Sequence, residues 1–255
     1  MRLGAALPPV AVGGGPLVAD SISSTAKLLE ELGYESLWVF DAVGRGFILP
    51  DPLTALAVAA TVTTELELGT GVLQLPIRNV VDVAHRVMSL HLLAGDRLLL
   101  GVGPGSTDRD FKTFGGDFSG RFARFEEQWA QLRQWLAEEG VGDSTLSPWP
   151  AVAGGPTLML AGWRGMWVER SATEASGWIA SAANADDATL ADAIARYRDA
   201  GGERAIVTNV QVSDNVGATI DRLGYLSDLG FDDAVVMDTR ASRDRYARVR
   251  RSISS

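Results

Sequence analysis

Hydrophobic positions between residues 66 and 105 follow two different patterns. Strand-like runs at 66–73 and 97–102 predict two strands, and each run ends at glycines. Between them, apolar residues recur at helical spacing, at Val81, Ala84, Met88 and Leu92. Asn79 is placed to cap this helix and Gly95 to end it. Strand, helix and strand together predict a βαβ unit with parallel strands and a right-handed crossover.

The same alternation of strand-like and helix-like segments continues along the chain. Further strands are predicted at about 2–7, 36–40, 157–160, 178–180, 205–212 and 234–237. Further helices are predicted at about 21–32, 51–63, 119–136, 167–175, 186–197, 216–229 and 242–253. Residues 106–118 are expected to form a polar loop, and residues 139–156 a Gly- and Pro-rich connection. The alternation and the length predict an α/β (β/α)8 TIM barrel in a single domain, residues 1–255, with a doubly wound open sheet as the alternative.

Composition narrows the classes of function. The formal net charge of −9 argues against a surface for nucleic acid or anionic membranes. The chain has no cysteine and two histidines, His85 and His91, which argues against a metal site and against a metal-dependent barrel hydrolase. The segment at 1–15 lacks the apolar core of a signal peptide, and no apolar run approaches ~18 residues. We therefore expect a cytoplasmic protein.

Active sites of such barrels lie where the strands end. The residues that follow the predicted strands are mostly glycines, amides and hydroxyls: Pro8, Asp41, Gly71–Gln74, Gly103–Ser106, Ala161–Arg164, Ser181–Asn184, Asn209–Gln211 and Asp238–Arg240. This rim favours the binding of a large, flat, partly anionic ligand, so that a cofactor would supply the chemistry. The turn at 161–165 fits either an anion site or a tight strand-to-helix turn. His85, within the apolar helix face, and His91 are expected to be structural.

Four segments resemble the bacterial luciferase-like flavin monooxygenase family. They are VAHRVMSLHLLAGDRLLLGVGPGS (83–106), GYESLWVFD (33–41), LELGTGVLQLPIRN (66–79) and LMLAGWRGMWVERSATEASGWI (158–179). Their order and spacing agree with the family across nearly the whole chain. Within the first segment His91, Ala94 and Asp96 depart from the residues that the family usually has.

The resemblance implies a barrel that binds reduced FMN or the deazaflavin coenzyme F420 and acts on a small organic substrate. Because short, acidic, Ala- and Arg-rich members of the family resemble its F420-dependent subgroup, the resemblance leans slightly to coenzyme F420. Cofactor-binding residues implied by position are Asp41, Gly71, Val72, Leu73, Gly103, Pro104, Gly105, Ser106, Ala161, Gly162, Trp163 and Arg164. The resemblance implies that residues 71–73 lie behind the flavin ring, with a non-proline cis peptide near Leu73. It also implies that residues 103–106 border the ring and the ribityl chain, and that residues 162–164 hold the phosphate. The family also implies a homodimer that packs around the second and third helices.

Two departures concern the chemistry. Ala42 stands where many members place a histidine, and Ser106 ends a run, Pro104–Ser106, where hydride-transferring members place a glutamate. The chain is also shorter than typical members. No catalytic residue is therefore assigned, and a catalytically silent member of the fold with a binding or assembly role is the alternative.

Overall fold

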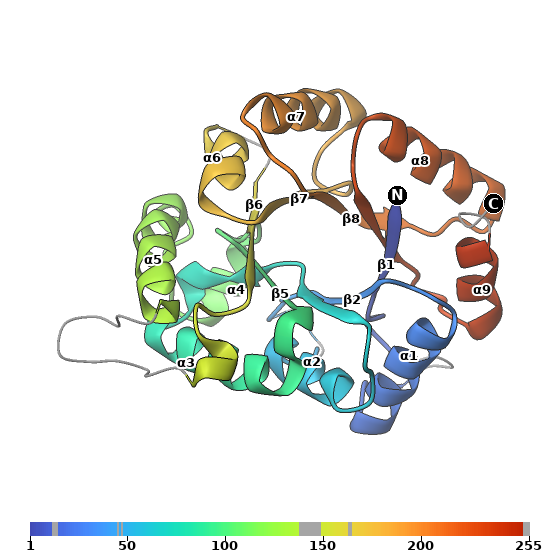
Figure 1. Ribbon diagram of the computed structural model, residues 1–255, viewed down its shortest axis with the longest axis horizontal. Helices are drawn as coiled ribbons and strands as arrows, with labels where there is room; N and C mark the ends of the chain where they lie inside the picture. The colour runs from blue at the N-terminus through green and yellow to red at the C-terminus, as the bar shows by residue number, and fades with distance from the viewer. Residues whose placement is uncertain (12–14, 45, 47, 138–148, 163–164, 252–255) are drawn as a thin grey trace.

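The computed structural model describes residues 1–11, 15–44, 46, 48–137, 149–162 and 165–251, and its strands form a ring surrounded by helices (Figure 1). The strands are β1 (Arg2–Ala6), β2 (Ser36–Val39), β3 (Glu67–Thr70), β4 (Leu73–Gln74), β5 (Leu98–Gly103), β6 (Thr157–Ala161), β7 (Gly177–Ser181), β8 (Ala205–Gln211) and β9 (Asp233–Met237). The helices are α1 (Ala19–Glu31), α2 (Pro52–Ala60), α3 (Val80–Ala94), α4 (Asp108–Thr113), α5 (Arg121–Leu136), α6 (Trp167–Glu174), α7 (Asp187–Asp199), α8 (Val216–Asp228) and α9 (Arg243–Arg251).

All strand pairings are parallel, and the sheet closes on itself. The order is β3-β2-β1-β9-β8-β7-β6-β5-β4, and β3 also pairs with β5. Segments β3 and β4 both pair with β5 and so share one position, which gives an eight-position barrel. The predicted (β/α)8 barrel is confirmed, and the open doubly wound sheet is excluded.

Local sequence signals explain most helix starts. Side chains of Asp51, Asn79 and Asp186 accept hydrogen bonds from free N–H groups in the first turns of α2, α3 and α7, and Asn79 was predicted in this role. The helix predicted from about residue 119 begins at Arg121 as α5, and no side chain caps it; the Asp117 carboxylate instead accepts from the N–H groups of Ser119 and Gly120 in the turn before it. The predicted polar loop at 106–118 contains the short helix α4.

The buried face of α3 lies about one residue away from the predicted stripe. Val81 is 36% exposed and Leu92 52% exposed, and His85, expected to be packed, is exposed as well. Ala84 and Met88 of the predicted stripe are buried as expected. The full buried face consists of Val80, Val83, Ala84, Val87, Met88, Leu90, His91 and Ala94. The apolar residues of α3 extend around most of its surface, so spacing alone did not identify the buried side.

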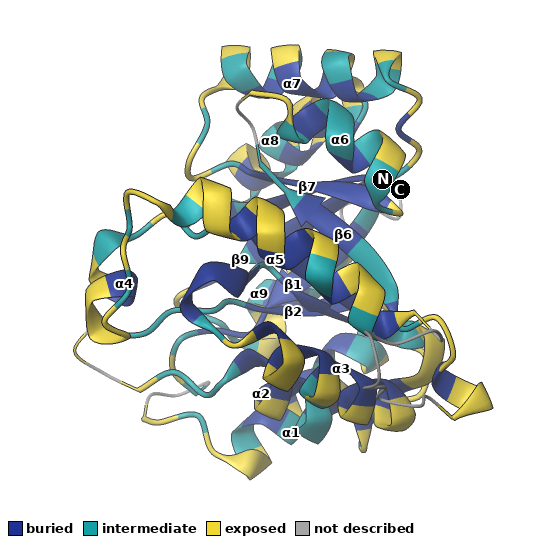
Figure 2. Ribbon diagram, turned by 90° about the vertical axis from the view of Figure 1, so that its left-hand side faces the viewer, coloured by how far each residue is buried: buried dark blue, intermediate teal, exposed yellow. Residues whose placement is uncertain are grey.

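Two apolar layers hold the fold together. The larger one lies between strands and helices, and helices expose mainly their outer faces (Figure 2). The smaller one fills the barrel and consists of Ala6, Trp38, Leu99, Met159, Ile179, Ile206 and Val235. Trp38 fits there because Gly69 faces it, since a Cβ at that position would lie 2.5 Å from the indole ring. Phe40, Val72, Ala161 and Met237 pack on top of this inner layer and form the floor of a cavity.

The N-terminal end of the barrel is closed by charged side chains. Arg204, just before β8, bonds Glu67 at the start of β3 (2.7 Å) and Asp233 at the start of β9 (2.9 Å). Arg2 at the start of β1 bonds Glu67 as well, at 2.9 Å. These four side chains, the basal ion network, link strands on opposite sides of the barrel.

No helix in the described ranges is long and apolar enough to cross a membrane. Among the same residues, no three or more His, Asp or Glu side chains gather in a way that could hold a metal ion.

Candidate functional site

A cavity of about 990 Å³ opens at the C-terminal end of the barrel. Its volume is at the upper end of the range for small-molecule and cofactor sites. It is lined by residues at or directly after the ends of β1, β2, β5, β6, β7 and β9, by two residues within β8, and by the break between β3 and β4. The position agrees with the prediction that strand ends would form the site.

Eight of the twelve predicted site residues line this cavity: Asp41, Gly71, Val72, Pro104, Gly105, Ser106, Ala161 and Gly162. Leu73 and Gly103 do not line it. Leu73 is fully buried in β4, and Gly103 faces Val72, since a Cβ there would lie 2.8 Å from the Val72 Cγ2. Trp163 and Arg164 lie outside the described residues.

The third position of the barrel is interrupted where it reaches the cavity. The predicted strand at 66–73 is divided into β3 and β4, and the peptide bond Gly71–Val72 between them is cis, within two residues of the expected Leu73. The Thr70 hydroxyl donates to the carbonyl of Gly101 on β5 at 2.7 Å. The break places Val72 on the cavity floor beside Phe40.

One wall contains a network of buried charges and an amide. Both carboxylate oxygens of Asp41 accept from the Arg78 guanidinium, at 2.6 and 2.8 Å, and one also accepts from the Gln74 backbone N–H at 2.9 Å. The Gln74 side-chain amide donates to the carbonyl of Asp41 and to the buried carboxylate of Asp110. Burial raises the pKa of Asp41, and the Arg78 charge opposes that shift. The network therefore fixes Asp41 in place, with its carboxylate already bonded.

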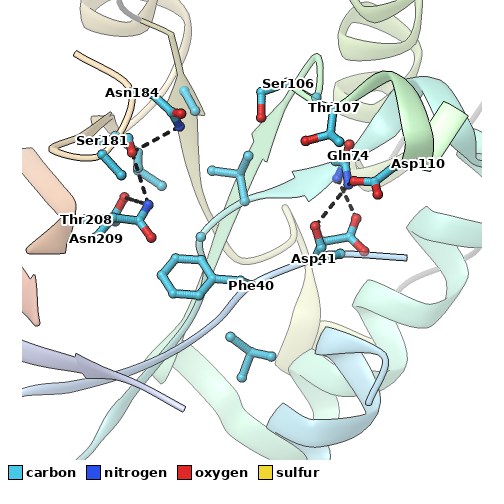
Figure 3. A pocket seen from close by; sticks show the side chains of 18 of the residues that line it. Phe40, Asp41, Gln74, Ser106, Thr107, Asp110, Ser181, Asn184, Thr208 and Asn209 are labelled. Carbon is cyan, nitrogen blue, oxygen red and sulfur yellow. Dashed lines mark hydrogen bonds between the residues drawn. The ribbon is translucent and has the colours of Figure 1, made fainter. Parts of the chain in front are cut away.

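The opposite wall is polar but uncharged (Figure 3). Ser181 at the end of β7 accepts from the Asn184 amide at 3.2 Å and from the Asn209 amide at 3.0 Å. The Thr208 hydroxyl donates to the carbonyl of Ala180 at 2.9 Å. Ser181, Asn184, Thr208 and Asn209, here called the hydroxyl–amide cluster, all line the cavity.

Arg121 is a site residue that the sequence analysis did not identify. It is the first residue of α5, donates to the carbonyls of Gly105 (3.2 Å) and Phe118 (2.9 Å), and stacks on the Phe118 ring. Among the described residues it is the cation that lines the cavity, and it has no carboxylate within 4.0 Å there. An arginine at a helix start is common on surfaces, so only its place beside Gly105 marks it as a site residue.

A model of the luciferase-like monooxygenase family matches residues 1–215. The chain belongs to this family. It is 40% identical over 93 residues to 4-hydroxyprotoasukamycin monooxygenase of Streptomyces nodosus subsp. asukaensis, a match that covers 36% of this chain and 25% of that protein. The sequence resemblance is therefore confirmed, although the matched segment spans about a quarter of this curated relative.

Solved structures agree on the fold over the whole chain. The monooxygenase RslO1 from Streptomyces bottropensis aligns with a TM-score of 0.81 at 17% identity, over 100% of this chain and 98% of that one. The coenzyme F420 dependent tetrahydromethanopterin reductase from Methanopyrus kandleri aligns with a TM-score of 0.77 at 14% identity, over 98% and 97%. At these identities the likeness concerns the fold.

Proposed function

We propose that the chain is an oxidoreductase that binds FMN or coenzyme F420 in the mouth cavity and acts on a small organic substrate. The observation that carries the proposal is the cavity itself, which has an apolar floor and a glycine-rich rim and, among the described residues, one cation without an acidic partner. A cofactor of this class supplies hydride transfer or dioxygen activation when it is bound. The protein would then contribute binding, orientation and exclusion of water.

The residues present fit such a group. Gly105, with φ of +80°, and Gly162 leave backbone accessible where a side chain would fill space. The Gly162 carbonyl is held by the indole N–H of Trp178, which fixes this part of the rim. Phe40, Val72 and Ala161 offer an apolar surface on which a flat ring can lie. These features support the predicted cofactor site at the strand ends.

Arg121 would hold the anionic end of the cofactor. It is anchored by the Gly105 and Phe118 carbonyls, and it stands at the N-terminus of α5, where the helix dipole also favours an anion. Arg164, predicted for the same role, stays a prediction. The preference for coenzyme F420 rests on composition alone, so both cofactors belong in the test.

Titration of the purified protein with FMN and with riboflavin tests the assignment of Arg121. We expect Arg121→Ala to weaken FMN binding roughly 10- to 150-fold, because one charged hydrogen-bond partner of the phosphate is removed. Riboflavin, which has no phosphate, should bind equally to both proteins. The same titrations are made with coenzyme F420 and its phosphate-free deazaflavin. The affinities of the wild type for FMN and for coenzyme F420 then show which cofactor is preferred.

Arg124→Ala is the matched control, since it removes the same charge from the same helix at an exposed position outside the cavity. An Arg121→Ala protein that binds FMN as tightly as the wild type would contradict the phosphate assignment. Absence of binding of both cofactors to the wild type would contradict the proposed function.

The second candidate function is a catalytically silent binding protein. It is supported by the residues of the cavity wall, which offer no free acid or base among those described. Asp41 and Asp110 are the carboxylates among the described lining residues. Asp110 is buried, the Asp41 side chain is 1% exposed, and both are hydrogen-bonded. Ala42 and Ser106 line the cavity at the two places where the family commonly has a histidine or a glutamate. Turnover of the bound cofactor with a reductant and a substrate would exclude this candidate.

The homodimer also stays a prediction. Val81, Leu92 and Leu93 on α3 are exposed apolar side chains in the region where the family resemblance places the dimer contact.

A further inference from the structure

The Ser181 hydroxyl has one hydrogen-bonding direction left for a ligand. A serine oxygen offers two acceptor sites and one donor hydrogen. The amides of Asn184 and Asn209 occupy the two acceptor sites of Ser181. The described residues provide no hydrogen bond that uses the Ser181 hydrogen, and Ser181, which is 8% exposed, lines the cavity. The hydrogen is therefore available to a molecule in the cavity.

Thr208 in the same cluster provides a contrast. Its hydroxyl lies on the same wall and accepts from the Asn209 amide at 3.3 Å. Its own hydrogen is already used, because the hydroxyl donates to the Ala180 carbonyl. Ser181 can thus donate a hydrogen bond to a ligand, whereas Thr208 cannot do so without losing its bond to Ala180.

The backbone of β8 is shaped to make this arrangement. Asn209 has φ of +61°, a left-handed conformation uncommon for residues other than glycine, and the β8–β9 register shifts between Val207 and Val210. Such irregularities re-aim side chains next to functional sites. Here the result is that the Asn209 amide reaches Ser181 across to β7.

We propose that Ser181 is a substrate-binding residue that donates its hydrogen bond to the oxygen of a neutral carbonyl group. The inference rests on the proposed function and adds the class of substrate. No charged side chain belongs to the hydroxyl–amide cluster, and the cation of the cavity, Arg121, contacts Gly105 on the other wall. An anionic group would be drawn to Arg121, whereas a neutral acceptor fits Ser181.

The surroundings of Ser181 favour a molecule that is otherwise apolar. Ile179 and Ala180, which precede Ser181 on β7, and Met237 at the end of β9 also line the cavity. Two amide donors also polarise the serine hydroxyl, which strengthens the bond that it donates in turn. An apolar ketone or aldehyde would place its carbon skeleton on these residues and its oxygen on Ser181.

Infrared spectroscopy of bound, carbonyl-labelled cyclohexanone tests the proposal directly. A donated hydrogen bond lowers the carbonyl stretching frequency, so we expect a red-shifted band with the wild type that disappears with Ser181→Ala. The affinity for cyclohexanone should fall roughly 2- to 13-fold. The affinity for methylenecyclohexane, which has the same shape without the oxygen, should not fall.

Two further variants separate the donated bond from mere packing. Thr208→Val is expected to keep the red-shifted band, because its hydrogen points to Ala180. Asn209→Asp keeps the side-chain shape and tolerates the left-handed backbone, but offers only acceptors, so the Ser181 hydrogen would turn to the carboxylate and the band would be lost. Ser181→Thr should retain the band.

Equal bands with the wild type and Ser181→Ala, or no red-shifted band with the wild type, would overturn the proposal. The measurement needs no cofactor, and it can therefore succeed where cofactor binding fails. Conversely, the FMN affinity of Ser181→Ala should equal that of the wild type. A failure of the Ser181 proposal in the infrared experiment can thus be told apart from a failure of the proposed function in the FMN titration.

Discussion

The two ends of the barrel differ in how the strands β3 and β8 are connected. β3 and β8 are four positions apart in either direction around the sheet, through β2, β1 and β9 or through β5, β6 and β7. At the N-terminal end, Arg204 and Glu67 join these strands by a 2.7 Å ion pair. At the mouth, Asn209 of β8 and Gly71, which follows β3, both line the cavity. One end is closed by paired charges, and the other keeps polar groups available to a ligand, which agrees with the division of stability and activity between the ends of such barrels.

The basal ion network is paired throughout. Asp233 is only 2% exposed, and Arg204 bonds it through two nitrogens. Burial by itself disfavours the charge of Arg204, but the hydrogen bonds to Asp233 and Glu67 outweigh that effect and raise the pKa of Arg204 above its ordinary value. The network stabilises the closed end only as long as each charge keeps its partner.

Breaking the basal ion network should have the largest effect on stability. Arg204→Met removes the guanidinium but keeps the side-chain stem. Among the cations that the structure describes, the buried Asp233 is then left with Arg2, at the longer distance of 3.7 Å. We expect the free energy of unfolding in urea to fall by ~3–5 kcal/mol, as for other buried pairs that lose one partner. The FMN affinity of the folded protein should not change, because the network lies at the end away from the cavity.

The exposed pair of Arg240 and Asp214 provides the control. Arg240→Met should lower the stability by no more than ~1 kcal/mol. A loss of similar size in both variants, or a loss of cofactor affinity in Arg204→Met, would refute the separation of the two ends.

The sequence predicts the closed barrel better than it predicts the cavity, for a physical reason. Apolar runs and helical spacing are local, and the alternation they produce was sufficient to predict the barrel and its strand ends. The cavity depends on contacts between distant residues, such as Asp41 with Arg78 and Ser181 with Asn209, which no local pattern encodes. The strand ends identified Ser181 and Asn209 as rim residues but did not reveal their hydrogen bonds, and Arg121 was missed because its partner, the Gly105 carbonyl, lies in another segment.

At the mouth, Gly105→Ala should have the next largest effect. A Cβ there would lie 2.5 Å from the Gln74 Oε1 and 2.9 Å from the Phe111 ring, in addition to the strain of φ at +80°. We expect a loss of ~1–3 kcal/mol of stability, measured in urea, and weaker FMN binding, because the anchor of Arg121 moves with the Gly105 carbonyl.

Gly115→Ala separates strain from contact in this experiment. Gly115 also has a positive φ, +67°, but a Cβ there would meet no atom within 4 Å. This variant should show the backbone strain alone and bind FMN as the wild type does. Equal FMN affinities for the wild type and Gly105→Ala would show that the Gly105 turn does not shape the site.

The closed end also contains a buried histidine, His91, which has no hydrogen bond to the described residues, and we expect it to have a smaller effect on stability. Both ring nitrogens of His91 on α3 are buried without a hydrogen-bond partner among the described residues. Burial lowers the pKa of His91, and the nearby Asp96 only partly opposes this. The unfolded chain then binds more protons than the folded one as the pH falls below the ordinary histidine value of about 6.5, so acidification destabilises the fold.

The two histidines of the chain allow a matched test of this pH dependence. The wild-type melting temperature should fall between about pH 7.5 and about pH 5.5, and His91→Gln should reduce the fall. His85→Gln changes an exposed side chain on the same helix and should leave the fall as in the wild type. If His91→Gln and His85→Gln melt with the same pH dependence, the buried histidine does not control the acid stability of the closed end.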